Sequence, residues 1–290
     1  MLPAKEIELI TQDETRIAAK LYKVEGTPRA KLIVAGATGV PQGFYRAFAD
    51  YAASRGFETL TLDYRGVGLS APQSLRDYKM DYRDWTVQDT AAAVNWMTRT
   101  TPSTGDLPLF MIGHSYGGHG FGQLPNWYKV QGFYTFATGA GWSGWMPPLE
   151  RVRVWLLWNL ISPVIVRIKG YLAWKKLGMG EDLPLGVYRQ WKHWCQYPHY
   201  FFDDPDMQHM KSMFAKITTP MVAANALDDL WALPASRNAF MSGYTGTAWQ
   251  GIDIDPAKFG LKAIGHMGYF KPQAKQLWSD ALDWFESLKA

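Results

Sequence analysis

The strongest constraint on the fold of this chain is a glycine-flanked segment, Gly113-His-Ser-Tyr-Gly117, which Gly118 follows. It comes after an apolar run, 107–113, that is typical of a buried strand, and a helical segment begins after Ser115. This spacing indicates a tight strand-to-helix turn, where a Cβ at either flanking position would collide with neighbouring backbone. The sequence therefore predicts that the turn presents the Ser115 hydroxyl at the edge of a sheet.

Around this turn, buried strands alternate with helices. The predicted strands cover 31–35, 57–63, 107–113, 132–138, 220–227 and 247–254, after a hairpin of 6–11 and 16–24; the predicted helices cover 44–54, 84–100, 273–288 and segments that start after 115 and at 234. This alternation predicts an α/β fold, with a mostly parallel central sheet and helices on both faces.

One stretch interrupts the alternation, because residues 141–215 contain helical and aromatic segments but no convincing strand. We expect a core made of 1–140 and 216–290, with 141–215 inserted as a helical cap. The most apolar part of the insertion, 154–168, is shorter than the roughly 20 apolar residues that a membrane-spanning helix needs. It predicts a buried or surface-docked helix pair that breaks at Pro163.

Composition excludes several classes of protein. The 290 residues include 30 Lys+Arg, 26 Asp+Glu (30 − 26 = +4) and one cysteine. A single cysteine excludes an internal disulfide framework and a cysteine-rich zinc site. The net charge is too small to indicate nucleic-acid binding, and the N-terminal sequence lacks the pattern of a signal peptide, so we expect a cytoplasmic protein.

A nucleophilic serine needs a general base, and the base needs an acid that orients it. Asp228 and Asp229 follow the predicted strand 220–227, and His266 lies in a glycine-flanked loop before the last helix. The order Ser, Asp, His is the one expected for this architecture. We predict Ser115, Asp229 and His266 as catalytic residues, with Asp228 as the alternative acid. His114 and His119 are poorer candidates for the base.

A tetrahedral intermediate also needs two backbone N–H donors. We expect one from Tyr116, the residue after the nucleophile, and one from the loop Gly36-Ala-Thr-Gly39, where Ala37 is favoured and Thr38 is next. This loop lacks the Gly-Lys-Ser/Thr of a phosphate-binding loop. We expect no metal ion and no organic cofactor.

These motifs together resemble the α/β-hydrolase superfamily. The resemblance includes the Gly36–Gly39 loop, the segment Asp63-Tyr-Arg-Gly-Val-Gly-Leu-Ser70, the turn at Ser115, and the Asp229 and His266 loops, all in the order of that superfamily. It is strongest to the branch of serine aminopeptidase and monoacylglycerol-lipase-like hydrolases. The resemblance implies an α/β-hydrolase fold and a Ser-His-Asp triad. Ala35 departs from the pattern, because many members have histidine there.

The insertion has an unusual composition. Seven of the 14 tryptophans lie in 141–215, and residues 151–192 hold eight Lys/Arg and two acids. The tryptophans indicate either an apolar roof over the site or anchors for a small helical insert. The local charge indicates either a solvated face or weak contact with a membrane surface.

The predicted function is that of a serine hydrolase, which cleaves a carboxylic ester with an apolar moiety through an acyl-enzyme. Alternatives are an acyltransferase, a thioesterase or a serine peptidase that uses the same residues, and a non-catalytic ligand receptor on the same fold. We expect a small apolar ester or acyl substrate and no nucleic-acid partner. The oligomeric state stays open.

Overall fold

An eight-stranded sheet forms the centre of the computed structural model, which describes residues 2–99 and 107–288. The strands are β1 (Lys5–Ile10), β2 (Arg16–Tyr22), β3 (Ala30–Ala35), β4 (Phe57–Leu62), β5 (Leu109–His114), β6 (Gly132–Phe136), β7 (Met221–Ala226) and β8 (Trp249–Ile254), in the order β1-β2-β4-β3-β5-β6-β7-β8. Strand β2 pairs antiparallel with β1 and β4, and all other pairs are parallel. The predicted hairpin and mostly parallel sheet are confirmed.

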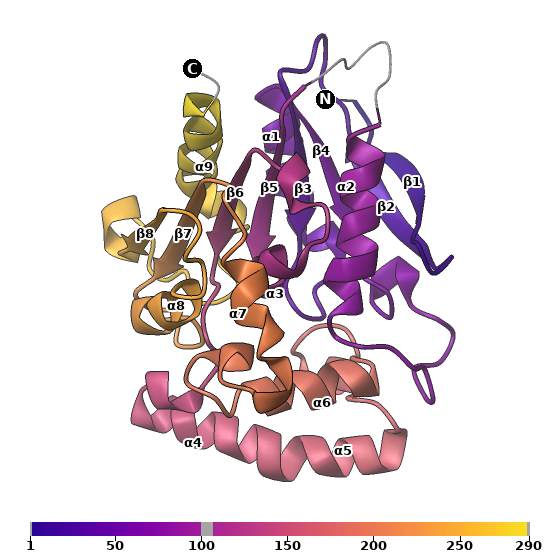
Figure 1. Cartoon of the computed structure of the whole chain (residues 1–290), viewed down its shortest axis with the longest axis vertical. Coiled ribbons are helices and arrows are strands. Elements are labelled where there is room, and N and C mark those ends of the chain that lie inside the picture. Colours follow the sequence, from indigo (N-terminus) through magenta and orange to yellow (C-terminus); the bar gives the residue numbers. More distant parts are fainter. Residues whose placement is uncertain (1, 100–106, 289–290) are drawn as a thin grey trace.

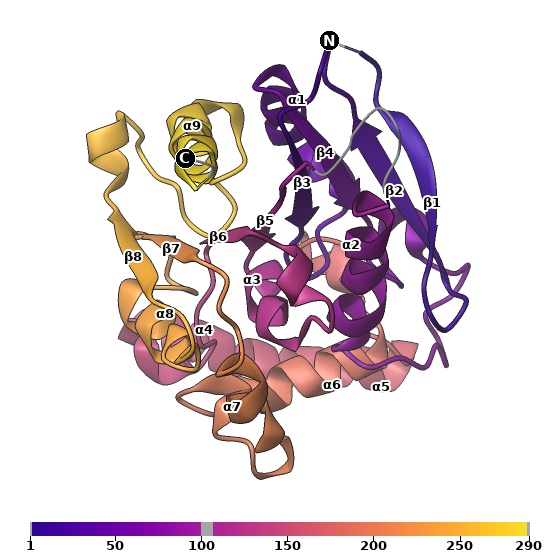
Figure 2. The ribbon, with the colours of Figure 1, turned by 45° about the horizontal axis from the view of Figure 1, so that its top comes forward.

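Helices cover both faces of the sheet (Figures 1 and 2). One face carries α1 (Arg46–Ser54) and α9 (Lys275–Ser287); the other carries α2 (Ala91–Met97), α3 (Tyr116–Gly120) and α8 (Pro234–Met241). Each layer buries its own apolar cluster. Phe48 and Leu282 belong to the first cluster, and Val94 and Phe240 belong to the second. Apolar residues at helical spacing therefore become the buried face of each helix, as the sequence predicts.

The parallel register brings the ends of distant strands together. Ala35 at the end of β3 pairs with Gly113 in β5, and Gly113 in turn pairs with Thr135 in β6. Strand β7 pairs with β6 in the same direction. The loops that follow these strands therefore leave from one edge of the sheet, where open α/β sheets bind their ligands.

The insertion between β6 and β7 lies along this edge (Figure 1). It contains α4 (Pro148–Leu156), α5 (Ser162–Lys169), α6 (Leu185–Trp194) and α7 (His209–Phe214). Its extended backbone forms an isolated bridge between Leu172 and Leu183 and contributes no strand to the sheet. None of the helices in the described ranges is both long and apolar enough to cross a bilayer.

The predicted break at Pro163 is wrong. Helices α4 and α5 continue into one another through a π-helical turn, residues 157–161, and Pro163 lies in the first turn of α5 (Figure 1). A proline inside a regular α-helix clashes with the carbonyl four residues before it. The wider turn just before Pro163 provides the local rearrangement that allows the chain to stay helical.

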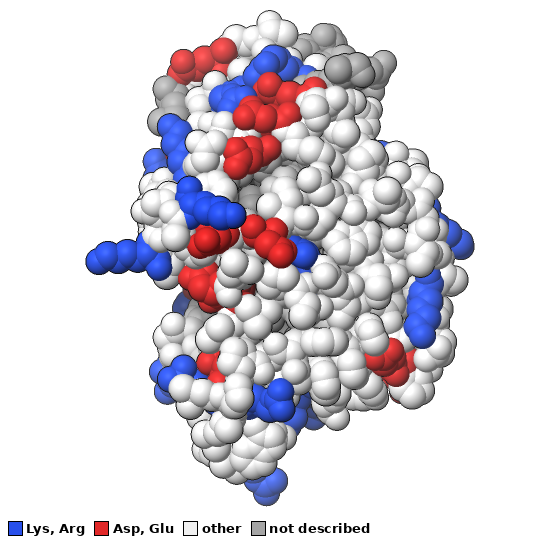
Figure 3. Space-filling view, turned by 90° about the vertical axis from the view of Figure 1, so that its left-hand side faces the viewer, with Lys and Arg blue, Asp and Glu red and all other residues white. Residues whose placement is uncertain are grey.

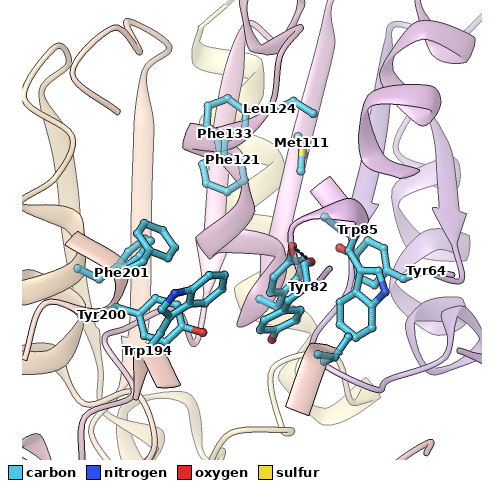
Figure 4. Packing of buried hydrophobic residues seen from close by; sticks show 14 of the residues in the cluster. Tyr64, Tyr82, Trp85, Met111, Phe121, Leu124, Phe133, Trp194, Tyr200 and Phe201 are labelled. Carbon is cyan, nitrogen blue, oxygen red and sulfur yellow. Dashed lines mark hydrogen bonds between the residues drawn. The ribbon is translucent and has the colours of Figure 1, made fainter. Parts of the chain in front are cut away.

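Aromatic side chains attach the insertion to the core. The indole of Trp194 stacks on the ring of Tyr82, with centroids 5.8 Å apart and an interplanar angle of 16°. Figure 4 shows Trp194 beside Tyr200 and Phe201 of the insertion, with Tyr82 of the core next to them and Trp85 on the far side of Tyr82. Part of the aromatic excess therefore anchors the insertion, which was one of the two interpretations of its tryptophans.

Candidate active site

The turn after β5 is as tight as the glycine spacing predicts. Ser115 has φ 51° and ψ −108°, a conformation that few non-glycine residues adopt. A Cβ on Gly117 would lie 2.1 Å from the carbonyl oxygen of Ala35, and a Cβ on Gly113 would lie 2.7 Å from the backbone of Gly117. Glycine is required at both positions because the strand and helix approach each other so closely.

Three side chains from distant loops meet at this turn. The Ser115 Oγ lies 3.0 Å from His266 Nε2, and His266 Nδ1 lies 3.0 Å from both carboxylate oxygens of Asp229. Asp229 follows β7, and His266 precedes α9. With the Nδ1–H donated to the carboxylate, Nε2 can accept the serine proton, which is the arrangement of a nucleophile, a base and an orienting acid.

The two adjacent aspartates have different partners. Asp229 is fully buried, and its carboxylate also accepts the backbone N–H groups of Trp231 and Ala232, at 3.2 Å each, and the Tyr269 hydroxyl at 3.1 Å. These hydrogen bonds satisfy the buried carboxylate and hold it in place. Asp228 instead accepts two backbone N–H groups of the loop before His266. The structure therefore brings Asp229, and not Asp228, to the imidazole.

The environment of His266 sets its protonation. Burial favours the neutral imidazole, but the charge of Asp229 and its hydrogen bond outweigh burial and raise the pKa of His266 above the ordinary 6.5. About 26% of its side chain remains exposed. The imidazole is thus held beside a buried charge while one side stays accessible from the cavity.

The other two histidines near the turn are engaged elsewhere. Burial lowers the pKa of His114 to about 3 and that of His119 to about 4, so both are neutral at physiological pH. His114 Nε2 lies 2.8 Å from the carbonyl oxygen of His266, and its Nδ1 lies 2.9 Å from the Tyr45 hydroxyl. His119 Nε2 lies 2.7 Å from the Gly139 carbonyl. Their hydrogen bonds are structural ones.

The two expected oxyanion donors differ in availability. The Tyr116 N–H has no hydrogen-bond acceptor among the described residues. For Ala37 the geometry goes against the prediction, because its N–H already donates to the Tyr45 hydroxyl at 2.7 Å. Within the described part of the chain the N–H of Thr38, the second candidate, meets no acceptor. Both loop residues line the cavity described next.

A cavity of about 660 Å³ opens onto Ser115 and His266. Its wall is mainly apolar and includes Trp174, Trp191 and Met179 from the insertion and Phe44, Trp231 and Met267 from the core. Such a wall suits an apolar ligand. Two tryptophans of the insertion therefore form a roof over the site, so both interpretations of the aromatic excess hold for different residues.

Sequence reasoning did not identify several neighbours of the site. Trp231, only two residues after Asp229, packs its ring 6.4 Å from that of His266. Tyr269 contacts Asp229, and Tyr45 contacts both Ala37 and His114. Of these neighbours, only Trp231 could have been predicted from the sequence, because it lies two residues after Asp229.

Comparison with known proteins places this geometry in context. Residues 26–169 match the family model described as serine aminopeptidase, S33. No curated protein sequence is significantly similar to the chain. A soluble variant of monoglyceride lipase from Saccharomyces cerevisiae, solved with a substrate analogue, has a TM-score of 0.68 at 14% identity, covering 99% of this chain and 95% of its own.

Two further solved structures are equally similar in fold. The α/β hydrolase GrgF from Penicillium sp. sh18 has a TM-score of 0.66 at 15% identity, with 99% of both chains covered. The Pyrococcus furiosus esterase Pf2001 has a TM-score of 0.67 at 11% identity, covering 98% of this chain and 91% of its own. At such low identity the likeness establishes the architecture, and the chemistry has to be argued from the side chains.

Proposed function

We propose that this chain, which has the α/β-hydrolase fold and resembles the serine hydrolases of that superfamily, cleaves carboxylic esters with an apolar moiety through an acyl-enzyme on Ser115. The observation that carries the proposal is the 3.0 Å distance between Ser115 Oγ and His266 Nε2 at the floor of an apolar cavity. It puts a hydroxyl and an imidazole nitrogen that can accept its proton within reach of a bound carbonyl carbon.

The first half-reaction acylates the serine. Ser115 Oγ attacks the ester carbonyl carbon while His266 Nε2 takes the hydroxyl proton, which produces an imidazolium and an oxyanion. The buried carboxylate of Asp229 stabilises the imidazolium. Collapse of the intermediate breaks the bond to the alkoxy oxygen, and the imidazolium returns its proton to the departing alcohol.

The second half-reaction restores the enzyme. Water gives a proton to His266 Nε2 and attacks the acyl carbon, and the resulting intermediate expels Ser115 Oγ, which regains the proton from the imidazolium. The products are one alcohol and one carboxylic acid. No step requires a metal ion or an organic cofactor.

Backbone donors are proposed to bind the oxyanion in both halves. The Tyr116 N–H lies at the N-terminus of α3, where the helix dipole favours negative charge. From the Gly36–Gly39 loop we propose Thr38, because its N–H meets no acceptor in the described ranges while that of Ala37 donates to Tyr45. Removal of one such donor typically lowers kcat by about 10²–10³-fold.

The proposed substrate class follows from the cavity wall. Trp174 and Trp191 of the proposed cap, residues 141–215, face Ser115 together with the core residue Trp231. Removing apolar surface from water stabilises an acyl or alkyl chain by about 0.8 kcal/mol per buried methylene. We therefore propose that medium-length esters are preferred over acetate esters.

Fluorophosphonate labelling followed by intact mass tests the nucleophile. We expect one adduct on the wild type and none on Ser115→Ala, with hydrolysis of p-nitrophenyl esters lost in parallel. A folded wild type that forms no adduct would contradict the proposal and favour the ligand receptor. An adduct without ester hydrolysis would favour an acyltransferase, a thioesterase or a peptidase, which product analysis with amine, thioester and peptide substrates separates.

A further inference from the structure

An exposed apolar stripe runs along the helix formed by α4, the π turn and α5. It consists of Leu149, Val152, Leu156, Leu160, Val164 and Ile168, whose exposed fractions lie between 38% and 65%. With Trp155 and Ile161, this helix holds eight of the sixteen large apolar side chains that are exposed among the described residues. Single exposed apolar residues are ordinary, but a contiguous row marks an interaction surface.

The stripe is separate from the face that attaches this helix to the protein. Val154, Leu157 and Trp158 are buried and belong to the apolar core. From Val152 onward the stripe residues recur every four positions, which would drift around a regular helix of 3.6 residues per turn. The π turn at 157–161 is wider and holds more residues per turn, so it reduces that drift.

The charges beside the stripe are almost all positive. Arg151, Arg153, Arg167 and Lys169 belong to the same helix, and Lys176 follows it. The neighbouring Lys175 is paired with Glu181 at 2.6 Å. Glu150 is the one acid in residues 148–169; only 12% of its side chain is exposed, and it faces Arg153 and Trp231. In Figure 3 the lower tip of the molecule, where α4 lies, shows blue side chains among white ones.

We propose that the stripe of α4 and α5 docks this protein on the surface of an anionic lipid bilayer. Apolar side chains on one side of a helix, flanked by Arg and Lys, favour the boundary between acyl chains and negatively charged headgroups. A second copy of the chain is a poorer occupant, because two stripes placed face to face would bring their arginines together. Docking requires no catalysis and is independent of the proposed function.

The cavity at Ser115 lies close in sequence to the stripe, which bears on how a substrate would enter. This consequence rests on the proposed function. The segment after α5 carries Leu177 and Met179, both exposed, and Met179 also lines the cavity at Ser115. Met179 at the rim of the cavity therefore follows Ile168, the last residue of the stripe, by eleven positions (179 − 168). An apolar ester dissolved in the bilayer would meet the rim directly.

Sedimentation with vesicles tests docking without any activity measurement. We expect the wild type to pellet with vesicles of phosphatidylcholine and phosphatidylglycerol, and to bind pure phosphatidylcholine about tenfold more weakly. At about 1 M salt the Debye length, over which charges attract each other, falls to about 3 Å. Binding to anionic vesicles should therefore weaken at that salt concentration. Val164→Glu/Ile168→Glu should lower the fraction bound at least about tenfold, since a charge replaces each inserted side chain.

The matched control changes two comparably exposed apolar residues outside the stripe. Leu2→Glu/Ile10→Glu adds the same charge before and at the end of β1, outside the insertion, and should leave vesicle binding at or above half of the wild-type level. If both double variants lost vesicle binding equally, the change in net charge would explain the loss. That result would overturn the stripe as the contact with lipid. No binding of the wild type to anionic vesicles would overturn the proposal.

An environment-sensitive fluorophore locates the contact. Cys195 is buried, and burial raises the pKa of its thiol, so a cysteine placed at 164 is labelled selectively. On anionic vesicles the probe at Val164→Cys should shift to the blue, while a probe at Ile10→Cys should not. A blue shift that instead depends on protein concentration without lipid, together with a dimer in sedimentation velocity, would assign the stripe to a second copy and overturn the proposal.

Discussion

His114 Nε2 lies 2.8 Å from the carbonyl oxygen of His266, so the residue before Ser115, the proposed nucleophile, supports the loop that carries the proposed base. With Nε2–H donated to this carbonyl, Nδ1 accepts a hydrogen bond from the Tyr45 hydroxyl. The Tyr45 oxygen in turn accepts the Ala37 N–H. One buried chain of hydrogen bonds therefore joins the His266 loop to the Gly36–Gly39 loop.

Replacing His114 with phenylalanine should destabilise the protein. The ring keeps its volume but leaves the His266 carbonyl and the Tyr45 hydroxyl without their partner, which costs about 1–3 kcal/mol for each unpaired buried group. Urea unfolding at pH 7 measures the loss. Tyr45→Phe removes the middle group of the same hydrogen-bond chain, so it should also lower the unfolding free energy. Unchanged stability in His114→Phe would show that the hydrogen-bond chain carries no energy.

Asp229→Asn should lower kcat by about 10⁴-fold, the loss typical of an orienting acid that becomes an amide. The base acts only when it is neutral, so activity falls as pH falls through the pKa of His266. Asp229 raises that pKa above 6.5, and its removal leaves burial to lower the pKa. The acid limb of kcat/KM should therefore start above pH 6.5 in the wild type and move to lower pH in the variant.

Asp228→Asn is the control one residue away. Its carboxylate accepts the N–H groups of Ile264 and Gly265, at 2.8 and 3.1 Å, and has no hydrogen bond to His266. We expect a lower unfolding free energy and an acid limb at the wild-type pH. A shift of that limb equal to the shift in Asp229→Asn would contradict the assignment of the acid.

Met179→Trp should restrict the protein to esters with shorter acyl chains. Met179 is 41% exposed and lines the cavity, so a larger side chain can be accommodated at the rim without disturbing the core. We expect kcat/KM for p-nitrophenyl octanoate to fall about tenfold or more, while the acetate ester changes less than about twofold, because each excluded methylene forfeits about 0.8 kcal/mol. Parallel losses on both esters would place the acyl chain elsewhere.

Asp89→Leu should destabilise the fold by about 3–5 kcal/mol, since it removes the buried one of the two carboxylates that pair with the buried Arg65 guanidinium. Asp89 is fully buried and accepts both the Arg65 side chain, at 2.7 Å, and the Arg65 backbone N–H, at 2.8 Å. Asp13 contacts the other end of the same guanidinium but is 43% exposed. Asp13→Asn should cost no more than about 1 kcal/mol in the same unfolding measurement.

The sequence was informative where one local rule decides the structure. Gly113 and Gly117 predict the turn at Ser115 because steric exclusion acts within five residues. It was less informative where contacts cross the fold: the hydroxyl of Tyr45 takes the Ala37 N–H from eight residues away, and that of Tyr269 reaches Asp229 from forty. The predicted helix break at Pro163 was wrong because the π turn before it lets the chain stay helical. The local sequence pattern does not reveal such a turn.

Trp231 joins α4 to the loop of Asp229, the proposed acid. The backbone N–H of Trp231 donates to Asp229, while its indole N–H donates to Glu150 of α4 at 3.1 Å. The helix proposed to dock on lipid is therefore two hydrogen bonds from the acid. Thermodynamic reciprocity then requires that, to the extent that docking changes ligand affinity at the site, a ligand in the cavity changes the partition of the protein onto vesicles by the same factor.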